Sequence, residues 1–254
     1  MTTDYAKTSL APPIWVLAMA VSAANVGISL LSPAIPQLRE DLMVTSDEAQ
    51  LVLSAFLIML GFGQLIAGSL SDRIGRRPVL VYGSLLFVLS GFGALLANSI
   101  ELLVFMRILQ GLGAAACMAM GRVIISDSFQ HAEAGRQMST ITMFQSVVPL
   151  LGFSFGGVLA DLVGWRGSVG LMVVTAVIVF AGASMLLAES RDPSIKPVPA
   201  TRIIFVYWQL LVTPLFIANA MMAATVTAVY FSMGGFLPYE LSLIHISEPT
   251  RQKP

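Results

Sequence analysis

Residues 68–77 read Gly-Ser-Leu-Ser-Asp-Arg-Ile-Gly-Arg-Arg, and this charged stretch lies between two long apolar runs. Its three arginines cannot lie in hydrocarbon, so the preceding helix should end near Leu70 and the next should begin near Pro78. A short, basic turn that contains glycine is typical of the cytoplasmic side of a membrane protein. The stretch therefore predicts a tight cytoplasmic turn between two membrane-spanning helices.

The composition indicates the same class of protein. Of the 254 residues, 56% are hydrophobic and 11% are charged, and the mean hydropathy is +0.83. So few polar residues cannot cover the surface of a soluble domain of this size. The formal net charge is zero, which gives no electrostatic reason to expect a nucleic-acid partner. We therefore expect an all-α transmembrane protein whose main partner is the lipid bilayer.

Apolar runs of membrane length recur along the chain. Each is near the ~20 residues that cross ~30 Å of hydrocarbon. The first six lie at about 14–36, 49–70, 79–98, 102–124, 139–160 and 168–188, and a seventh lies at about 212–237. The first run is too long for a cleavable signal peptide and should remain as the first span.

Lys and Arg residues are unevenly divided between the two sides of these spans. One side collects Lys7, Arg73, Arg76, Arg77, Arg122, Arg136, Arg191, Lys196 and Arg202. The other side has Arg39, Arg107 and Arg166. Basic residues accumulate in cytoplasmic loops, so the N-terminus is predicted to be cytoplasmic in a multi-pass protein.

These features divide the chain into four segments. Residues 1–188 are predicted to form a six-helix bundle, and 189–211 a proline-rich cytoplasmic linker. Residues 203–211 fit either an interfacial helix or the plain start of the next helix. Residues 212–240 should form a seventh transmembrane helix. Residues 241–254 are predicted to be a non-native tail, because they read like a translated sequencing adapter.

The charged stretch resembles a motif of the major facilitator superfamily, Gly-x-x-x-Asp-Arg-x-Gly-Arg-Arg, which lies between helices two and three of its twelve-helix members. The matching residues are Gly68, Asp72, Arg73, Gly75, Arg76 and Arg77. The resemblance implies a gating loop that locks against the partner half of the protein, with Asp72 near the N-terminus of a partner helix. A generic positive-inside loop would explain the arginines, but not the two glycines and the aspartate.

The fourth span resembles another element of this superfamily, Arg-x-x-x-Gly-x-Gly-Ala. Arg107 starts the match, and the resemblance implies a role in coupling or substrate binding. The alternative is that Arg107 extends to the outer interface near Glu101. Gln110 lies one turn further along nearly the same face, and Gly111 and Gly113 would let a neighbouring helix approach closely.

The fifth span resembles the motif of drug:proton antiporters within the superfamily. It contains Pro149, Gly152, Gly156 and Gly157. Gly152 and Gly156 make a face of small residues, and Pro149 should leave a carbonyl unpaired and bend the helix. A generic helix-packing face is the alternative interpretation.

The end of the first span, Pro33-Ala-Ile-Pro36, most resembles the Bcr/CflA multidrug efflux subgroup. In that subgroup a membrane-embedded aspartate precedes the motif, whereas this chain has Ser29. A serine cannot carry a proton near neutral pH, so the proton carrier must be another group. Asp161 and Glu101 are candidates near the outer ends of spans, and a second half of the protein is the alternative location.

A substrate cavity is expected where polar side chains of several spans face inward. The candidates for coupling or substrate binding are Asn25, Ser29, Gln64, Arg107, Gln110 and Gln145. The sequence shows no catalytic constellation, no metal-ligand cluster and no phosphate-binding loop. An enzyme, a cofactor and an ATP-driven motor are therefore not expected, and a proton gradient would supply the energy.

The resemblance as a whole implies a bacterial inner-membrane secondary transporter that exports small amphipathic compounds or drugs by proton antiport through alternating access. Such folds work with two six-helix bundles, so the present chain should lack most of its C-terminal half and should not transport alone. One alternative is an uptake carrier for a sugar or metabolite. Another is a non-transporting membrane scaffold or an inert truncated product.

Overall fold

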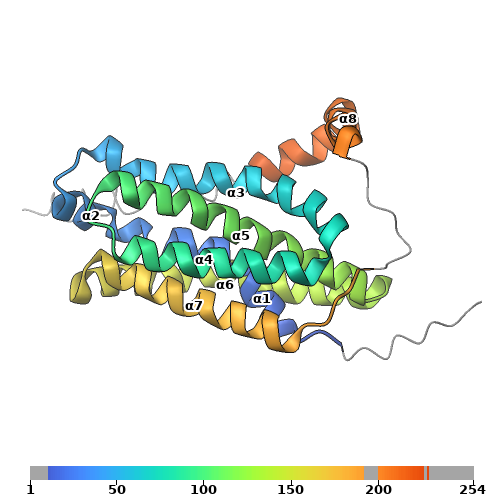
Figure 1. Cartoon of the computed structure of the whole chain (residues 1–254), viewed down its shortest axis with the longest axis horizontal. Helices are drawn as coiled ribbons and strands as arrows, with labels where there is room; N and C mark the ends of the chain where they lie inside the picture. Colours follow the sequence, from blue (N-terminus) through green and yellow to red (C-terminus); the bar gives the residue numbers. More distant parts are fainter. Residues whose placement is uncertain (1–10, 192–199, 226–227, 229–254) are drawn as a thin grey trace, which may run out of the picture. The chain divides into compact units, whose positions relative to one another are not determined.

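Helices form the regular structure of residues 11–191, 200–225 and 228, the residues that this computed structural model describes (Figure 1). The elements are α1 (Ile14–Ser29), the 3₁₀ helix η1 (Ser32–Ala34), α2 (Ile35–Leu42), α3 (Ser46–Ile74), α4 (Arg76–Leu95), α5 (Ile100–Ser128), α6 (His131–Val163), α7 (Trp165–Leu186) and α8 (Ala200–Val212). The described residues contain six segments long and apolar enough to cross a membrane, with α1 to α2 counted as one. The predicted all-α transmembrane class is confirmed.

The helix of the first span is interrupted near the end of the predicted apolar run of about 14–36. Helix α1 ends at Ser29, η1 follows, and α2 begins at Ile35. Pro33 and Pro36 have no N–H group, so neither can donate the hydrogen bond that would continue the α-helix. Each proline instead sits in the first turn of a new helix, where a missing N–H costs nothing.

The junction between α3 and α4 is shorter than predicted. Helix α3 continues to Ile74 and α4 begins at Arg76, so the expected ends near Leu70 and Pro78 are wrong. Gly75 alone separates the two helices, with φ 107° and ψ 160°. A positive φ of this kind is readily adopted only by glycine. The charged stretch is therefore mostly helical, because arginine side chains can extend away from hydrocarbon while their backbone stays helical.

Helix α5 packs against α1, α3 and α4 and forms the centre of the first compact unit, Met1–Pro197 (Figure 1). Two glycines allow these close approaches. Gly111 lies against the backbone of Phe56 in α3. A Cβ atom added to Gly113 would lie 2.7 Å from the carbonyl oxygen of Gly83 and 2.7 Å from the amide nitrogen of Phe87, both in α4. Contact of backbone with backbone leaves no flexible side chain to move aside.

Helix α6 packs on α1 through its small residues. Gly152 lies against the Ser29 side chain, and Gly156 lies against the backbone of Leu30. A Cβ atom on Gly157 would meet nothing within 4 Å, so this third glycine makes no close helix contact. Pro149 is buried inside α6, which is assigned as one helix from end to end.

The outer surface of the first unit is strongly apolar along α3 and α6. Its exposed side chains include Leu51, Ile58, Phe62, Leu65 and Ile66 of α3, and Met143, Phe144, Leu150, Leu151 and Phe155 of α6. An apolar surface of this extent is stable in lipid or against other helices, but not in water.

The second compact unit, Val198–Pro254, contains α8 and a shorter apolar helix over Pro214–Thr225. Thr213 separates them, and Pro214 explains the break because it lacks an N–H group. Part of the predicted linker is therefore helical. The remainder of the predicted seventh helix beyond residue 228, and the tail 241–254, lie outside the described residues.

We expect Gly113→Ala to destabilise the bundle by about 1–3 kcal/mol, because the new methyl group meets backbone on α4. Gly157→Ala is the matched control, since it adds the same methyl group to open space and gains helix propensity. Thermal denaturation of the two purified variants in detergent measures the difference. Equal midpoints would contradict the packing assigned to Gly113.

Candidate functional site

The Arg76 side chain joins three helices at the junction of α3 and α4. Its Nη1 atom donates to the Asp72 carboxylate and, at 2.7 Å, to the Ser71 hydroxyl. Its Nε atom donates to Asp127 Oδ2 at 3.0 Å, and Asp127 lies in the last turn of α5. The Arg76 side chain is only 15% exposed, so water screens these ion pairs less than it would at an open surface. The arrangement fixes the ends of α3, α4 and α5 together.

Glu189, which follows α7, caps the N-terminus of α4. Its carboxylate oxygens accept hydrogen bonds from the backbone N–H groups of Arg76, at 2.8 Å, and Arg77, at 3.2 Å. A negative charge is favoured at this position because the first N–H groups of a helix have no partners within it. A Cβ atom on Gly75 would collide with the same carboxylate. Gly75 is therefore favoured by its positive φ, and a Cβ atom there would also displace the capping carboxylate.

Two further arginines hold the chain after α7 to the same place. Arg77 Nη2 donates to the carbonyl oxygen of Ser184 at 2.6 Å. Arg191 Nη1 donates to the carbonyl oxygen of Arg73 at 2.7 Å, at the end of α3. The first residues of the predicted linker thus have a fixed position. We call the set Asp72, Arg76, Arg77, Asp127, Glu189 and Arg191 the junction cluster.

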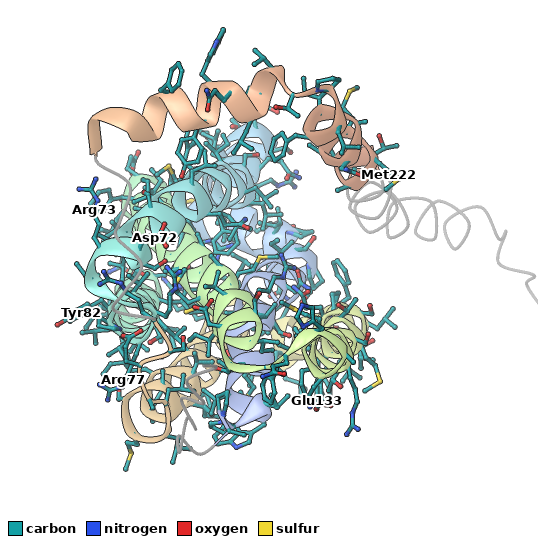
Figure 2. All side chains as sticks on the ribbon, turned by 90° about the vertical axis from the view of Figure 1, so that its right-hand side faces the viewer. Asp72, Arg73, Arg77, Tyr82, Glu133 and Met222 are labelled. Atoms are coloured by element: carbon teal, nitrogen blue, oxygen red, sulfur yellow. The ribbon has the colours of Figure 1, made fainter. Side chains whose placement is uncertain are left out.

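Figure 2 places Asp72, Arg73, Arg77 and Tyr82 at one end of the bundle. The Asp72 side chain is 45% exposed, so part of its carboxylate is accessible although Arg76 binds it. Arg73 is exposed, and Gly68 faces open space. The predicted gating residues are therefore close together, and Gly68 joins the network through its carbonyl oxygen, which accepts a hydrogen bond from the Ser71 hydroxyl at 2.8 Å.

Arg107 is fully buried in the interior of the bundle. Its Nη2 atom donates to the carbonyl oxygen of Gly27 at 2.8 Å, and its Nε atom donates to that of Val52 at 3.2 Å. Its Nη1 atom donates to Gln110 Oε1 at 2.9 Å, and the guanidinium lies 4.1 Å from the centre of the Phe56 ring. These partners come from α1, α3 and α5. The side chain therefore points inward, away from the outer interface.

A second polar cluster joins α1, α5 and α6, and it begins at Pro149. Because proline has no N–H group, the carbonyl of Gln145, four residues earlier, has no partner in its own helix. Asn25 Nδ2 donates to that carbonyl at 3.1 Å. The Gln145 side chain accepts from Arg122 Nη2 at 3.0 Å and donates to the carbonyl of Val21 at 3.3 Å. The carbonyl that the sequence predicted to be unpaired is satisfied from α1.

The predicted cavity residues thus separate into three places. Arg107 and Gln110 lie in the bundle interior, and within the described residues Gln110 Nε2 has no partner. Asn25 and Gln145 lie with Arg122, whereas Gln64 bonds only to its own helix, at Leu60 O 3.4 Å away.

Ser29 is buried beside the Asn25 cluster, and its hydroxyl donates to the carbonyl oxygen of Asn25 at 2.7 Å. The position where a subgroup acid was expected is therefore filled by a short, satisfied side chain.

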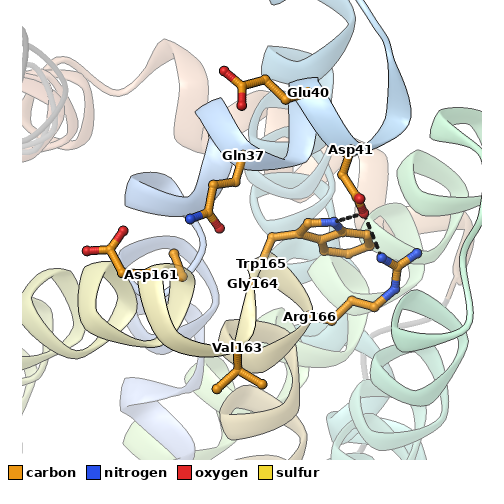
Figure 3. Close-up of a pocket in the computed structure, with 9 residues that line it drawn as sticks. Gln37, Glu40, Asp41, Asp161, Val163, Gly164, Trp165 and Arg166 are labelled. Carbon is orange, nitrogen blue, oxygen red and sulfur yellow. Dashed lines mark hydrogen bonds and ion pairs between the residues drawn. The ribbon is translucent and has the colours of Figure 1, made fainter.

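The opposite end of the bundle contains a polar pocket of about 590 Å³ (Figure 3). Asp41 Oδ2 accepts hydrogen bonds from Trp165 Nε1 and Arg166 Nη1, each at 2.8 Å. Arg166 Nη2 also donates to the carbonyl oxygen of Ala97 at 2.9 Å. These bonds tie the start of α7 to α2 and to the end of α4. Asp161 also lines the pocket, at the end of α6 rather than in the middle of a span.

The sequence matches the Major Facilitator Superfamily over residues 17–248, which is most of the chain. The chain belongs to this superfamily. It is 32% identical over 214 residues to the "Chloramphenicol resistance protein" of Pseudomonas aeruginosa, and the aligned region covers 82% of this chain and 48% of that protein. It is 30% identical over 187 residues to "Multidrug resistance protein D" of Escherichia coli (strain K12), which covers 73% of the chain and 46% of that protein. The chain spans about half the length of the curated relatives it matches.

A solved structure of this superfamily type has the same fold. The peptide transporter POT, a mutant in complex with alafosfalin, superimposes with a TM-score of 0.65 over 93% of this chain and 52% of that chain. The sequence identity is 15%, so this likeness concerns the fold alone.

Four residues of the junction cluster and of the cluster around Gln145 were not among the site residues predicted from the sequence: Asp127, Glu189, Arg191 and Arg122. Asp127 and Glu189 contact Arg76 across 51 and 113 residues of chain, so no local spacing indicates them. Arg191 and Arg122 were counted only as basic residues of the predicted cytoplasmic side, although Arg122 carried a further signal. The position of Arg122 six residues before the end of a long apolar helix was a usable signal, because a charge this far inside a span is costly.

We expect Glu189→Ala to increase hydrogen exchange at the amides of Arg76 and Arg77 by about five- to thirtyfold, because losing a helix N-cap typically costs about 1–2 kcal/mol. Mass-spectrometric exchange on peptides covering the start of α4 measures this. Glu133→Ala is the control, since Glu133 accepts a bond from the nearby Gln137 side chain within α6. Unchanged exchange in Glu189→Ala would show that the carboxylate does not cap α4.

Proposed function

We propose that this chain is the N-terminal part of a secondary transporter that exports small amphipathic compounds or drugs across the bacterial inner membrane, with a cytoplasmic N-terminus. The observation that carries the proposal is the polar cluster of Asn25, Arg122 and Gln145 within otherwise apolar spans. Polar side chains in such spans are costly and are typical of a substrate pathway. The relatives named for chloramphenicol and multidrug resistance support export as the direction.

The transport cycle would use alternating access of two bundles around this cluster, with residues 1–188 as the first bundle. Under this proposal the junction cluster makes the cytoplasmic end of the first bundle rigid. The half-exposed carboxylate of Asp72 would then bind the N-terminal end of a helix in the second bundle, where a negative charge is favoured. Breaking and remaking that contact would accompany each cycle.

We propose that the driving force is proton antiport and that the proton carrier is neither Ser29 nor a neighbour of Ser29. Within the described helices, every acidic residue lies within about one turn of a helix end. A carboxylate near the membrane surface remains hydrated and is poorly placed to carry a proton between two closed states. The carrier would therefore belong to the second bundle.

The proposal predicts that the complete reading frame containing this chain lowers chloramphenicol accumulation in a susceptible bacterial strain, and that a protonophore abolishes the effect. Asp72→Asn should reduce efflux about fivefold, since a charge at a helix N-terminus contributes about 1 kcal/mol. Asp47→Asn is the matched control, because Asp47 lies at the other end of the same helix. Membrane insertion should be equal in both variants.

Two results would contradict this proposal. The first is that expression leaves chloramphenicol accumulation unchanged although the protein is present in the membrane. This result would rule out export of this compound. The second is full efflux in Asp72→Asn, which would remove the gating role while leaving transport intact.

A further inference from the structure

Arg122 differs in its partners from Arg76, Arg107 and Arg166. Arg76 and Arg166 are paired with carboxylates, and Arg107 is enclosed by backbone carbonyls and Gln110. Arg122 makes one hydrogen bond within the described residues, from Nη2 to the neutral Gln145 amide at 3.0 Å. A guanidinium has five N–H donors, so most of its donors remain available.

Arg122 lies where two helices contact each other little. Helices α5 and α6 both pack on α1, and they contact each other much less. Arg122 is partly exposed and bridges from α5 to α6 across this gap. One turn before it on the same face of α5 lies Met118, also partly exposed, and one turn after it lies Ser126, which is exposed. The guanidinium therefore borders a surface with an apolar, adaptable side chain beside it.

Among the described residues, no ion pair joins Arg122 to a carboxylate. The acidic residues of the described helices are Glu40, Asp41, Asp47, Glu48, Asp72, Glu101, Asp127, Glu133 and Asp161, all within about one turn of a helix end. Asp127 is the acidic residue of α5 nearest in sequence to Arg122, and it binds Arg76. The wall formed by Asn25, Arg122 and Gln145 is therefore electropositive, and a low-dielectric surrounding strengthens its field.

We propose that Arg122 selects the substrate class, binding neutral or anionic compounds through a nitro, carbonyl or carboxylate oxygen and excluding organic cations. This inference rests on the transport function proposed above. A guanidinium is suited to this task because its planar donors match the two oxygens of a nitro or carboxylate group. An organic cation at the same place would meet an uncompensated positive charge.

The test uses purified protein from the complete reading frame, reconstituted in liposomes, with two probes of similar size. Chloramphenicol presents a neutral nitro group, and tetraphenylphosphonium is an organic cation. Equilibrium binding and transport are both measured for each probe. We expect the unaltered protein to bind chloramphenicol at least tenfold more tightly than tetraphenylphosphonium.

Two variants distinguish the effect of the Arg122 charge from the effect of its bridge to α6. Arg122→Gln removes the charge and should weaken chloramphenicol binding by about ten- to a hundredfold, the range expected for hydrogen bonds to a charged group. Gln145→Glu keeps Arg122 and its bridge to α6 but neutralises the charge, so it should also weaken chloramphenicol binding and admit tetraphenylphosphonium. Arg136→Gln, at an exposed position of α6, is the control and should change neither affinity.

Several results would overturn the inference. Equal affinity of the unaltered protein for the two probes would exclude charge selection, and this holds even if a variant fails to fold. Unchanged selectivity in folded Gln145→Glu would exclude Arg122 as its source. Selective binding without transport of either probe would instead reject the proposed transport function and leave the binding preference in place.

Discussion

The requirement that polar groups inside a membrane protein find partners from within the protein governs this structure, and Arg107 is its clearest case. The guanidinium is fully buried and bonds to the backbone of Gly27 and Val52 and to Gln110. Removing such a charge from water is costly, and only several well-placed acceptors compensate for the cost. The partners lie on α1, α3 and α5, so satisfying one side chain fixes how three helices sit together. The close approach at Gly111 is compatible with that arrangement.

The same requirement explains the polar cluster between α1 and α6. Pro149 frees the carbonyl of Gln145, and Asn25 from another helix provides the missing donor. Once Asn25 and Gln145 are held in this way, the Gln145 side chain can accept from Arg122. A helix irregularity thus creates a polar site at a depth where apolar packing would otherwise be expected, and the proposed substrate selection depends on it.

A charge costs less free energy at the ends of the bundle than in its interior, because water and headgroups are accessible there. Arg76 and Arg166 form ion pairs with carboxylates from distant parts of the chain, and each pair joins different helices. The bundle therefore has polar clusters at both ends that fix helix positions and a less constrained polar wall between them. This division is consistent with the proposed transport cycle, in which the bundles would move as rigid bodies around a central site.

The membrane class, the six spans and the resemblance to the superfamily follow from the sequence alone, because hydropathy, span length and motif spacing are local properties of the chain. The prediction from the sequence placed the helix ends at the charged stretch wrongly, since a charged side chain does not force its own backbone out of a helix. Which polar groups meet one another depends on the packing of the helices. Asp127 and Glu189 reach Arg76 from distant segments. Such contacts depend on how helices pack, and no periodicity along the chain encodes that packing.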